Sequence, residues 1–242
     1  MKSSYLSDSS MTISNKLPGI GTTILTVMSQ IAEDYDFINL SQGGRGFSEP
    51  ADLVERLNYY AASGFNQYPP MHGIPYLRQQ IKKKVSNCYN SHYNEENEIT
   101  VVSEATKGLL VAIQTVVRAG DVVIVFDPVY DAYDPAVRLA GGKALHIPLI
   151  APEFIIDFQR LKDTISDRTR AIVINSPHNP SGAVLSPHHI QQLAELVESR
   201  DIYLIADEVY EHMTYDGVRH ESLSRNETLK QRIFVVSSFG ND

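Results

Sequence analysis

Six short runs of apolar and β-branched residues, separated by helical patterns, shape the chain from residue 99 onward. The runs cover residues 99–102, 122–126, 144–149, 171–175, 202–206 and 233–237. Amphipathic periodicity predicts helices between them at 106–118, 133–140, 157–166 and 187–200. Continuous apolar runs are typical of strands buried on both faces, and strand-helix alternation favours parallel pairing. The sequence therefore predicts an α/β fold, with a mostly parallel sheet and helices on both faces.

The part of the chain before residue 99 is mainly helical. Apolar residues recur at helical spacing over 22–35, 51–63 and 74–88. The first ten residues lack the apolar segment of a signal peptide. We therefore expect a disordered tail over residues 1–16.

Composition and charge narrow the classes of function. The 242 residues carry a net charge of −8 with scattered basic residues, which argues against nucleic-acid binding. No apolar run approaches the roughly 18 to 20 residues that a membrane-spanning helix needs. The single cysteine, Cys88, excludes an internal disulfide and fits a reducing compartment such as the cytoplasm. Cys88 follows Leu77, Ile81 and Val85 at helical spacing, so we expect it in the core, and we expect no metal site.

Polar residues directly follow five of the six runs. Ligands of open α/β sheets bind beyond the carboxyl ends of the strands, so these residues are the candidates for a functional site. They lie at 103–106, 127–130, 176–180, 207–210 and 237–241.

Most of these residues also have an ordinary structural interpretation. Thr106 can be a helix N-cap, or it can help a helix N-terminus to bind a phosphate. Tyr130 can simply pack, or it can offer its face to a flat ring, and Asn179 is by default part of a turn. Asp207 differs, because a carboxylate directly after a buried strand needs a cationic or hydrogen-bonding partner. A protonated pyridine nitrogen is such a partner.

Taken together, these motifs resemble the fold-type I pyridoxal-phosphate (PLP) aminotransferases of class I/II, the branch that contains methionine and kynurenine aminotransferases. The resemblance extends from about Leu17 along nearly the whole chain. Six strings in the family order carry it: INLSQG at 38–43, NQYPPMHG at 66–73, residues 120–142, NSPHNPSG at 175–182, ADEVYE at 206–211 and SSFG at 237–240.

The resemblance implies PLP as cofactor and a set of residues that hold its ring. Asp207 matches the aspartate that pairs with the pyridinium nitrogen, which keeps the ring an electron sink. Asn179 and Tyr210 match the residues that bind the phenolic oxygen, and Tyr130 matches the aromatic residue that stacks on the ring.

The resemblance also implies contacts to the phosphate and the substrate. Ala105, Thr106 and Ser238 match the phosphate-binding residues. Tyr68 matches a tyrosine that reaches the phosphate of the neighbouring subunit, which implies a homodimer. Gly43, together with Asn179, matches the residues at the substrate carboxylate. The implied parts are a tail at 1–16, an N-terminal arm with part of the small domain at 17–50, and the large PLP-binding domain at 51–242, without the C-terminal small domain.

Three positions depart from the family pattern. Asn241 stands where the family has its Schiff-base lysine, and an amide cannot form that imine. Glu104 stands where the phosphate turn usually begins with glycine, so we expect weaker phosphate binding. Arg45, in the string GRGF at 44–47 where the family usually has FPDF, is either a substitute ligand for the substrate carboxylate or a solvated loop residue, and we favour the solvated loop residue.

The expected activity is transfer of an amino group from an amino acid, aromatic or sulfur-containing, to a 2-oxo acid. With Asn241 at the lysine position, we expect the chain as given to be inactive and C-terminally truncated. One alternative is a non-catalytic remnant that binds PLP weakly or pairs with a full-length relative. Another is a PLP-dependent C–S β-lyase. A nicotinamide-binding domain is disfavoured, because no G-x-G-x-x-G follows the first run.

Overall fold

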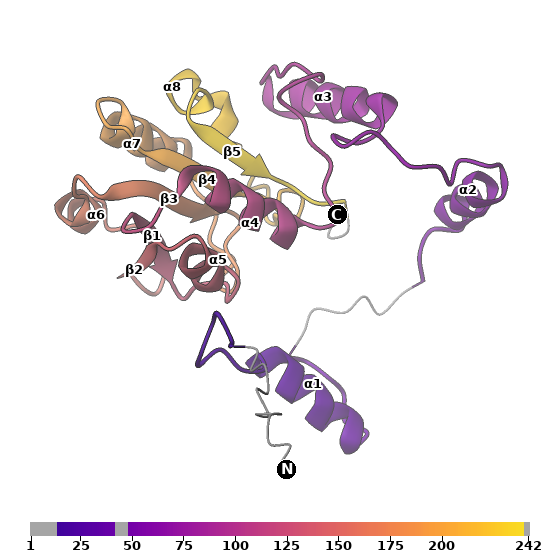
Figure 1. Cartoon of the computed structure of the whole chain (residues 1–242), viewed down its shortest axis with the longest axis horizontal. Coiled ribbons are helices and arrows are strands. Elements are labelled where there is room, and N and C mark those ends of the chain that lie inside the picture. Colours follow the sequence, from indigo (N-terminus) through magenta and orange to yellow (C-terminus); the bar gives the residue numbers. More distant parts are fainter. Residues whose placement is uncertain (1–13, 42–47, 240–242) are drawn as a thin grey trace, which may run out of the picture.

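One parallel sheet organises the molecule (Figure 1). The structure, a computed structural model, describes residues 14–41 and 48–239. Its five strands lie in the order β2-β1-β3-β4-β5, and every neighbouring pair is parallel. The strands are β1 (Val122–Asp127), β2 (Lys143–Pro148), β3 (Thr169–Asn175), β4 (Tyr203–Asp207) and β5 (Ile233–Val236).

Helices cover both faces of this sheet, as the sequence predicted (Figure 1). Helices α4 and α5 pack on one face, and α6, α7 and α8 pack on the other. Their bounds are α4 (Ala105–Val116), α5 (Tyr133–Leu139), α6 (Phe158–Thr164), α7 (Pro187–Val197) and α8 (Glu227–Lys230), with a short 3₁₀ turn η1 (Leu223–Arg225) before α8.

Strand β1 shows why its sequence is apolar without a break. Val123 and Val125 belong to the apolar cluster under α4 and α5, whereas Ile124 and Phe126 belong to the cluster under α6 and α7. Successive side chains of a strand point to opposite faces, so a strand covered on both sides needs apolar residues at every position. Each fully buried aliphatic side chain contributes about 1.5 to 3 kcal/mol to folding.

Helix α7 shows how local signals set the ends of an element. Ser186 is its N-cap, whose hydroxyl accepts a hydrogen bond from the His189 amide over 3.3 Å, and Pro187 occupies the first helical position. Ile190, Leu193 and Val197 then face the sheet and are buried. A cap followed by apolar residues at helical spacing fixes both the start and the orientation of the helix.

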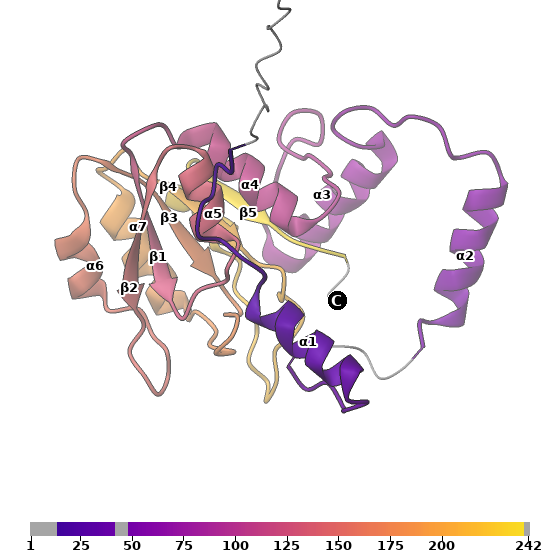
Figure 2. The same cartoon turned by 60° about the horizontal axis from the view of Figure 1, so that its bottom comes forward.

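The three N-terminal helices lie outside the sheet layers. Helices α1 (Ile24–Asp34) and α2 (Ala51–Ala62) contain no buried residue, and α2 stands apart from the other elements in both views (Figures 1 and 2). Helix α3 (Pro75–Tyr89) lies on the β5 side of the sheet (Figure 2). None of the described helices is both long enough and apolar enough to cross a bilayer.

Two sequence-based predictions in the N-terminal part are wrong. Cys88 is exposed: the buried residues of α3 are Arg78 and Tyr89, whereas the apolar row before Cys88 is only half-buried and its coverage ends before Cys88. Residues 99–102 do not form a strand: the Val101 amide donates to the His72 carbonyl over 3.0 Å, and no ladder forms. A short apolar run becomes a strand only where a neighbouring strand offers a row of partners.

Candidate functional site

The carboxyl ends of β3 and β4 bring two of the predicted polar segments together. Asn175 and Asp207 are opposite each other in the register of these strands. The Asn175 amide nitrogen donates to the Asp207 carbonyl over 2.9 Å, and its amide oxygen accepts from the Asn179 backbone over 2.7 Å. Asn175 therefore fixes the turn that carries Asn179 against the end of β4.

Asp207 is a buried acid held by neutral donors. Asp207 is only 5% exposed. Its Oδ2 accepts a hydrogen bond from the Tyr133 hydroxyl over 2.5 Å, and its Oδ1 accepts one from the Val209 amide over 3.3 Å. Burial raises the pKa of Asp207, although the two hydrogen bonds oppose the shift. A cationic partner would remove much of the cost of keeping this carboxylate charged.

Tyrosines surround this carboxylate. The rings of Tyr130 and Tyr133 meet edge to face with centroids 5.6 Å apart, and the Tyr130 hydroxyl lies 3.4 Å from Thr106 Oγ1 at the start of α4. Burial, and after it the nearby Asp207 carboxylate, raise the pKa of Tyr210. The Tyr210 phenol therefore stays protonated at neutral pH and is able to donate a hydrogen bond.

The start of α4 provides backbone donors beside this cluster. Glu104 is the N-cap residue and makes no side-chain cap bond, while Ala105 and Thr106 are half-buried. The backbone at this position does not require glycine, because Glu104 has a φ of −164°, an extended conformation that any residue adopts. Its side chain is exposed, so its effect on an anion is electrostatic.

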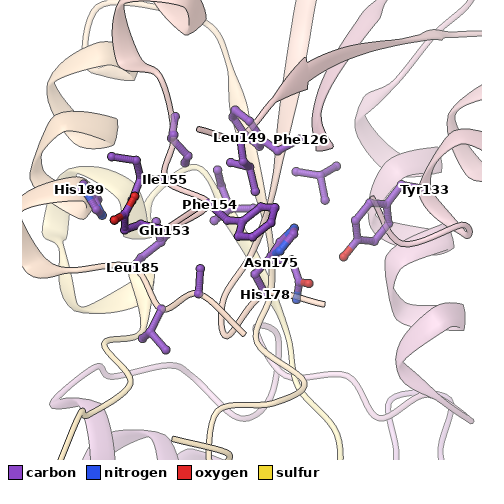
Figure 3. Close-up of a pocket in the computed structure, with 15 residues that line it drawn as sticks. Phe126, Tyr133, Leu149, Glu153, Phe154, Ile155, Asn175, His178, Leu185 and His189 are labelled. Atoms are coloured by element: carbon purple, nitrogen blue, oxygen red, sulfur yellow. The ribbon is translucent and has the colours of Figure 1, made fainter. Parts of the chain in front are cut away.

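A cavity of about 230 Å³ lies beside the cluster (Figure 3). Tyr133 and Asn175 line one side of it, and Glu153, Leu185 and His189 lie toward the other. Its walls are mainly apolar, and they include none of Asp207, Asn179 and Tyr210. Asp207, Asn179 and Tyr210 therefore lie next to the cavity, at the carboxyl end of the sheet, and they are the groups there that can hydrogen-bond a polar ligand. Among the described residues, no cluster of three metal-ligating side chains occurs.

The structure brings together most of the residues singled out in the sequence. Tyr68 is separate: it lies in the connection between α2 and α3, 101% exposed. Gly43, Arg45 and Asn241 lie outside the described residues. The residues near the carboxyl ends of the strands are Ala105, Thr106, Tyr130, Asn179, Asp207, Tyr210 and Ser238.

Sequence reasoning missed two residues that organise the cluster, Tyr133 and Asn175. Tyr133 follows Tyr130 by three residues and begins α5, and its amide donates to the Tyr130 carbonyl over 3.3 Å, so a turn keeps the two tyrosines close together. Asn175 ends a buried strand as Asp207 does, and the same argument that selected Asp207 would have selected it.

Comparison with known proteins gives consistent matches. The model of the family "Aminotransferase class I and II" matches residues 35–242. Methionine aminotransferase of Escherichia coli is 42% identical over 226 residues, which cover 93% of this chain and 58% of the relative. Human kynurenine–oxoglutarate transaminase 3 is 30% identical over 95% of this chain and 53% of its own length. The chain thus spans between half and three-fifths of the length of these relatives.

Solved structures agree with this picture. An Escherichia coli protein whose crystal structure and reactivity identify a methionine aminotransferase function superposes with a TM-score of 0.90 at 40% identity, covering 96% of this chain and 60% of that one. N-succinyldiaminopimelate aminotransferase of Mycobacterium tuberculosis superposes with a TM-score of 0.89 at 34% identity, covering 94% and 60%.

Proposed function

Because this chain belongs to the class I and II aminotransferase family, we propose that it forms the cofactor-binding part of a PLP-dependent aminotransferase. The reaction moves an amino group from an amino acid to a 2-oxo acid. The observation that supports this most is Asp207, a buried carboxylate whose donors, Tyr133 and Val209, are both neutral. Its environment is completed by a cationic N–H, which a protonated pyridine ring offers.

The described residues fit the other parts of the cofactor as well. When bound, PLP supplies an electron sink for the electrons released at the substrate Cα. Asp207 would hold the ring nitrogen, and Asn179 and Tyr210 would hold the phenolic oxygen. Tyr130 would cover one face of the ring.

The phosphate would lie at the start of α4, where the amides of the first turn carry partial positive charge. Ala105 and Thr106 would contribute from this turn, and Ser238 from the segment after β5. Tyr133 would act on Asp207 by keeping its carboxylate oriented toward the ring nitrogen.

Substrate and partner assignments extend the proposal. Relatives named as methionine and kynurenine transaminases support a sulfur-containing or aromatic donor. A homodimer would allow Tyr68, exposed in its own chain, to reach the phosphate site of the partner subunit. Gly43 would lie at the substrate carboxylate, and location in the cytoplasm stays a prediction.

Asn241 favours a second candidate, PLP binding without transamination. An amide side chain can neither anchor PLP covalently nor carry the proton between the substrate Cα and the cofactor, two tasks for which the family uses its lysine. We propose that the chain as given binds the cofactor weakly and does not turn over. A C–S β-lyase would use the same described contacts, which therefore do not favour it.

Pyridoxamine phosphate is the sharpest probe of the proposed site. Its amine cannot form an imine with any lysine, so calorimetric titration of the 242-residue chain measures the non-covalent contacts alone. We expect saturable binding that Asn179→Ala weakens about tenfold, the effect of one lost hydrogen bond to a charged group. A chain that does not bind this compound would contradict the proposal.

A separate measurement distinguishes the two candidates. The chain is incubated with PLP, reduced with borohydride and digested, and the peptides are analysed by mass spectrometry. A phosphopyridoxyl group on one lysine at stoichiometric yield would support transamination by a substitute lysine. Scattered, substoichiometric labelling of surface lysines would show that no lysine serves as the Schiff-base partner, and together with saturable binding of pyridoxamine phosphate it would support binding without transamination.

A further inference from the structure

The carboxylate of Glu211 receives hydrogen bonds from three side chains, two on helix α3 and one directly after β5. Lys84 of α3 donates to Oε1 over 2.8 Å, and the Tyr89 hydroxyl at the end of the same helix donates to Oε2. The hydroxyl of Ser237, directly after β5, also donates to Oε1. Glu211 is 5% exposed, so these contacts are made almost without water.

Hydrogen bonds stabilise the negative charge of Glu211 in its buried position. Burial alone would raise the pKa of this carboxyl, but the hydrogen bonds from Lys84, Ser237 and Tyr89 outweigh burial and lower the pKa. Glu211 therefore accepts as a carboxylate at neutral pH, and charge-assisted hydrogen bonds of this kind are roughly twice as strong as neutral ones.

The position of Glu211 connects both ends of the proposed cofactor site. It follows Tyr210, which would hold the phenolic oxygen, and its partner Ser237 precedes Ser238, which would bind the phosphate. The backbones of these two segments also meet, because the Glu208 amide donates to the Val236 carbonyl over 2.8 Å. One buried carboxylate thus sets the separation of two ligand-binding segments that lie more than twenty residues apart in sequence.

Stability alone is a weak reason for such an arrangement. Burying a charged pair costs desolvation, and apolar residues of similar volume are often as stable. The hydrogen bonds of Glu211 do fix the relative positions of α3, the segment after β4 and the segment after β5. Hydrogen bonds are directional, so they fix such positions more closely than apolar packing does.

We propose that Glu211 is a positioning residue that holds the Tyr210 and Ser238 segments at the spacing the cofactor requires, with α3 as its anchor. The inference rests on the proposed function. It assigns helix α3 a share in cofactor affinity through the contact of Lys84 with Glu211.

Two neighbouring lysines of α3 offer a matched test. Lys84 reaches Glu211, whereas Lys82 pairs with Glu95 over 2.5 Å. The variants Lys84→Met and Lys82→Met, with Ser237→Ala as a third, are titrated with pyridoxamine phosphate and with pyridoxamine, which lacks the phosphate. Hydrogen exchange of residues 207–213 and 233–239 is measured in the same samples.

We expect Lys84→Met to weaken binding of pyridoxamine phosphate about tenfold and Lys82→Met to leave it unchanged. Ser237→Ala should weaken pyridoxamine phosphate but not pyridoxamine, because it releases only the phosphate side. Exchange should accelerate in 207–213 and 233–239 while β1 and β3 stay protected, which distinguishes a local change from unfolding. Partial recovery of affinity in Lys84→Arg, which keeps a charged donor, would support positioning.

Two outcomes would overturn the inference in different ways. If the unaltered chain binds pyridoxamine phosphate and Lys84→Met behaves like Lys82→Met in both titration and exchange, the inference fails and the proposed function stands. If the unaltered chain does not bind pyridoxamine phosphate, the proposed function is wrong, and the inference that rests on it is wrong as well.

Discussion

The hydroxyl of Tyr133 donates a hydrogen bond to Asp207 Oδ2 over 2.5 Å, joining the first turn of α5 to the end of β4. The two residues are 74 positions apart in sequence, and both are buried. Burial raises the pKa of Asp207, and the hydrogen bond from Tyr133 opposes that shift in part. Burial also raises the pKa of Tyr133, and the nearby Asp207 carboxylate raises it further. Asp207 therefore depends on a tyrosine that the sequence analysis did not single out.

Tyr133→Phe removes that donor while keeping the ring. We expect the free energy of unfolding to fall by about 2 kcal/mol at neutral pH, because the buried Asp207 carboxylate loses the Tyr133 hydroxyl and keeps only the Val209 amide as a donor. Affinity for pyridoxamine phosphate should also fall, since Asp207 loses its orientation. Urea unfolding and calorimetric titration measure the two effects. An unchanged affinity together with reduced stability would restrict Tyr133 to a structural role.

Asp207→Asn should stabilise the ligand-free chain and weaken cofactor binding. Because burial raises the folded-state pKa of Asp207, the folded protein binds its proton more tightly than the unfolded chain does. The resulting penalty is absent below the ordinary pKa of 3.8, grows as pH rises through the folded-state pKa, and is complete above it. We expect the variant to be about 1 kcal/mol more stable at pH 7, with no gain at pH 3. Thermal unfolding at both pH values, with titration of pyridoxamine phosphate, checks this, and a destabilised variant at pH 7 would contradict it.

His220→Ala should destabilise the fold strongly. Glu208 and His220 are buried; Glu208 Oε2 lies 3.0 Å from His220 Nε2, and Oε1 accepts from the Leu223 amide over 3.0 Å. Removing the imidazole leaves a buried carboxylate with one partner fewer, which costs about 3 kcal/mol.

His146→Ala is the matched control for His220→Ala. His146 pairs with Asp127 over 2.9 Å, but both side chains are about two-fifths exposed. Water replaces the lost partner there, so we expect less than about 0.5 kcal/mol. Urea denaturation of both variants measures the difference, and equal effects would contradict the role of burial.

Glu104→Gln should strengthen binding of phosphate-bearing ligands. Glu104 places an exposed negative charge at the N-terminus of α4, where the phosphate would lie. Removing that charge should raise the affinity for pyridoxamine phosphate about threefold and leave the affinity for pyridoxamine unchanged, an effect of the size known for exposed charges at helix ends. Added salt should reduce the gain. A gain that is the same for both ligands would exclude the phosphate as its cause.

Asn241→Lys restores the amine that the family motif contains at this position. We expect incubation with PLP followed by borohydride to label residue 241 at close to one group per chain. Asn241→Gln serves as the control, since it changes the side chain without adding an amine. A restored lysine that is not labelled would show that the cofactor site of this chain does not hold PLP next to residue 241.

The sequence by itself determined the layers of this protein. Of the six strands expected from apolar runs, five are present, and all the expected helices and the parallel sheet are present as well. These features follow from the periodicity of residues at neighbouring positions. The position of Asp207 followed in the same way, since the carboxyl ends of parallel strands share one edge.

The tertiary structure alone decided what those side chains touch. Tyr133 reaches Asp207, and Lys84 reaches Glu211 across 127 positions of sequence, contacts that no local pattern encodes. The run at 99–102 failed as a strand for the same reason: strand formation needs a partner, and a partner is a property of the folded chain. Periodicity along the sequence sets which face of a helix or strand is apolar. The distances between helices and strands are set by packing of the whole core, and the geometry of the proposed site depends on those distances.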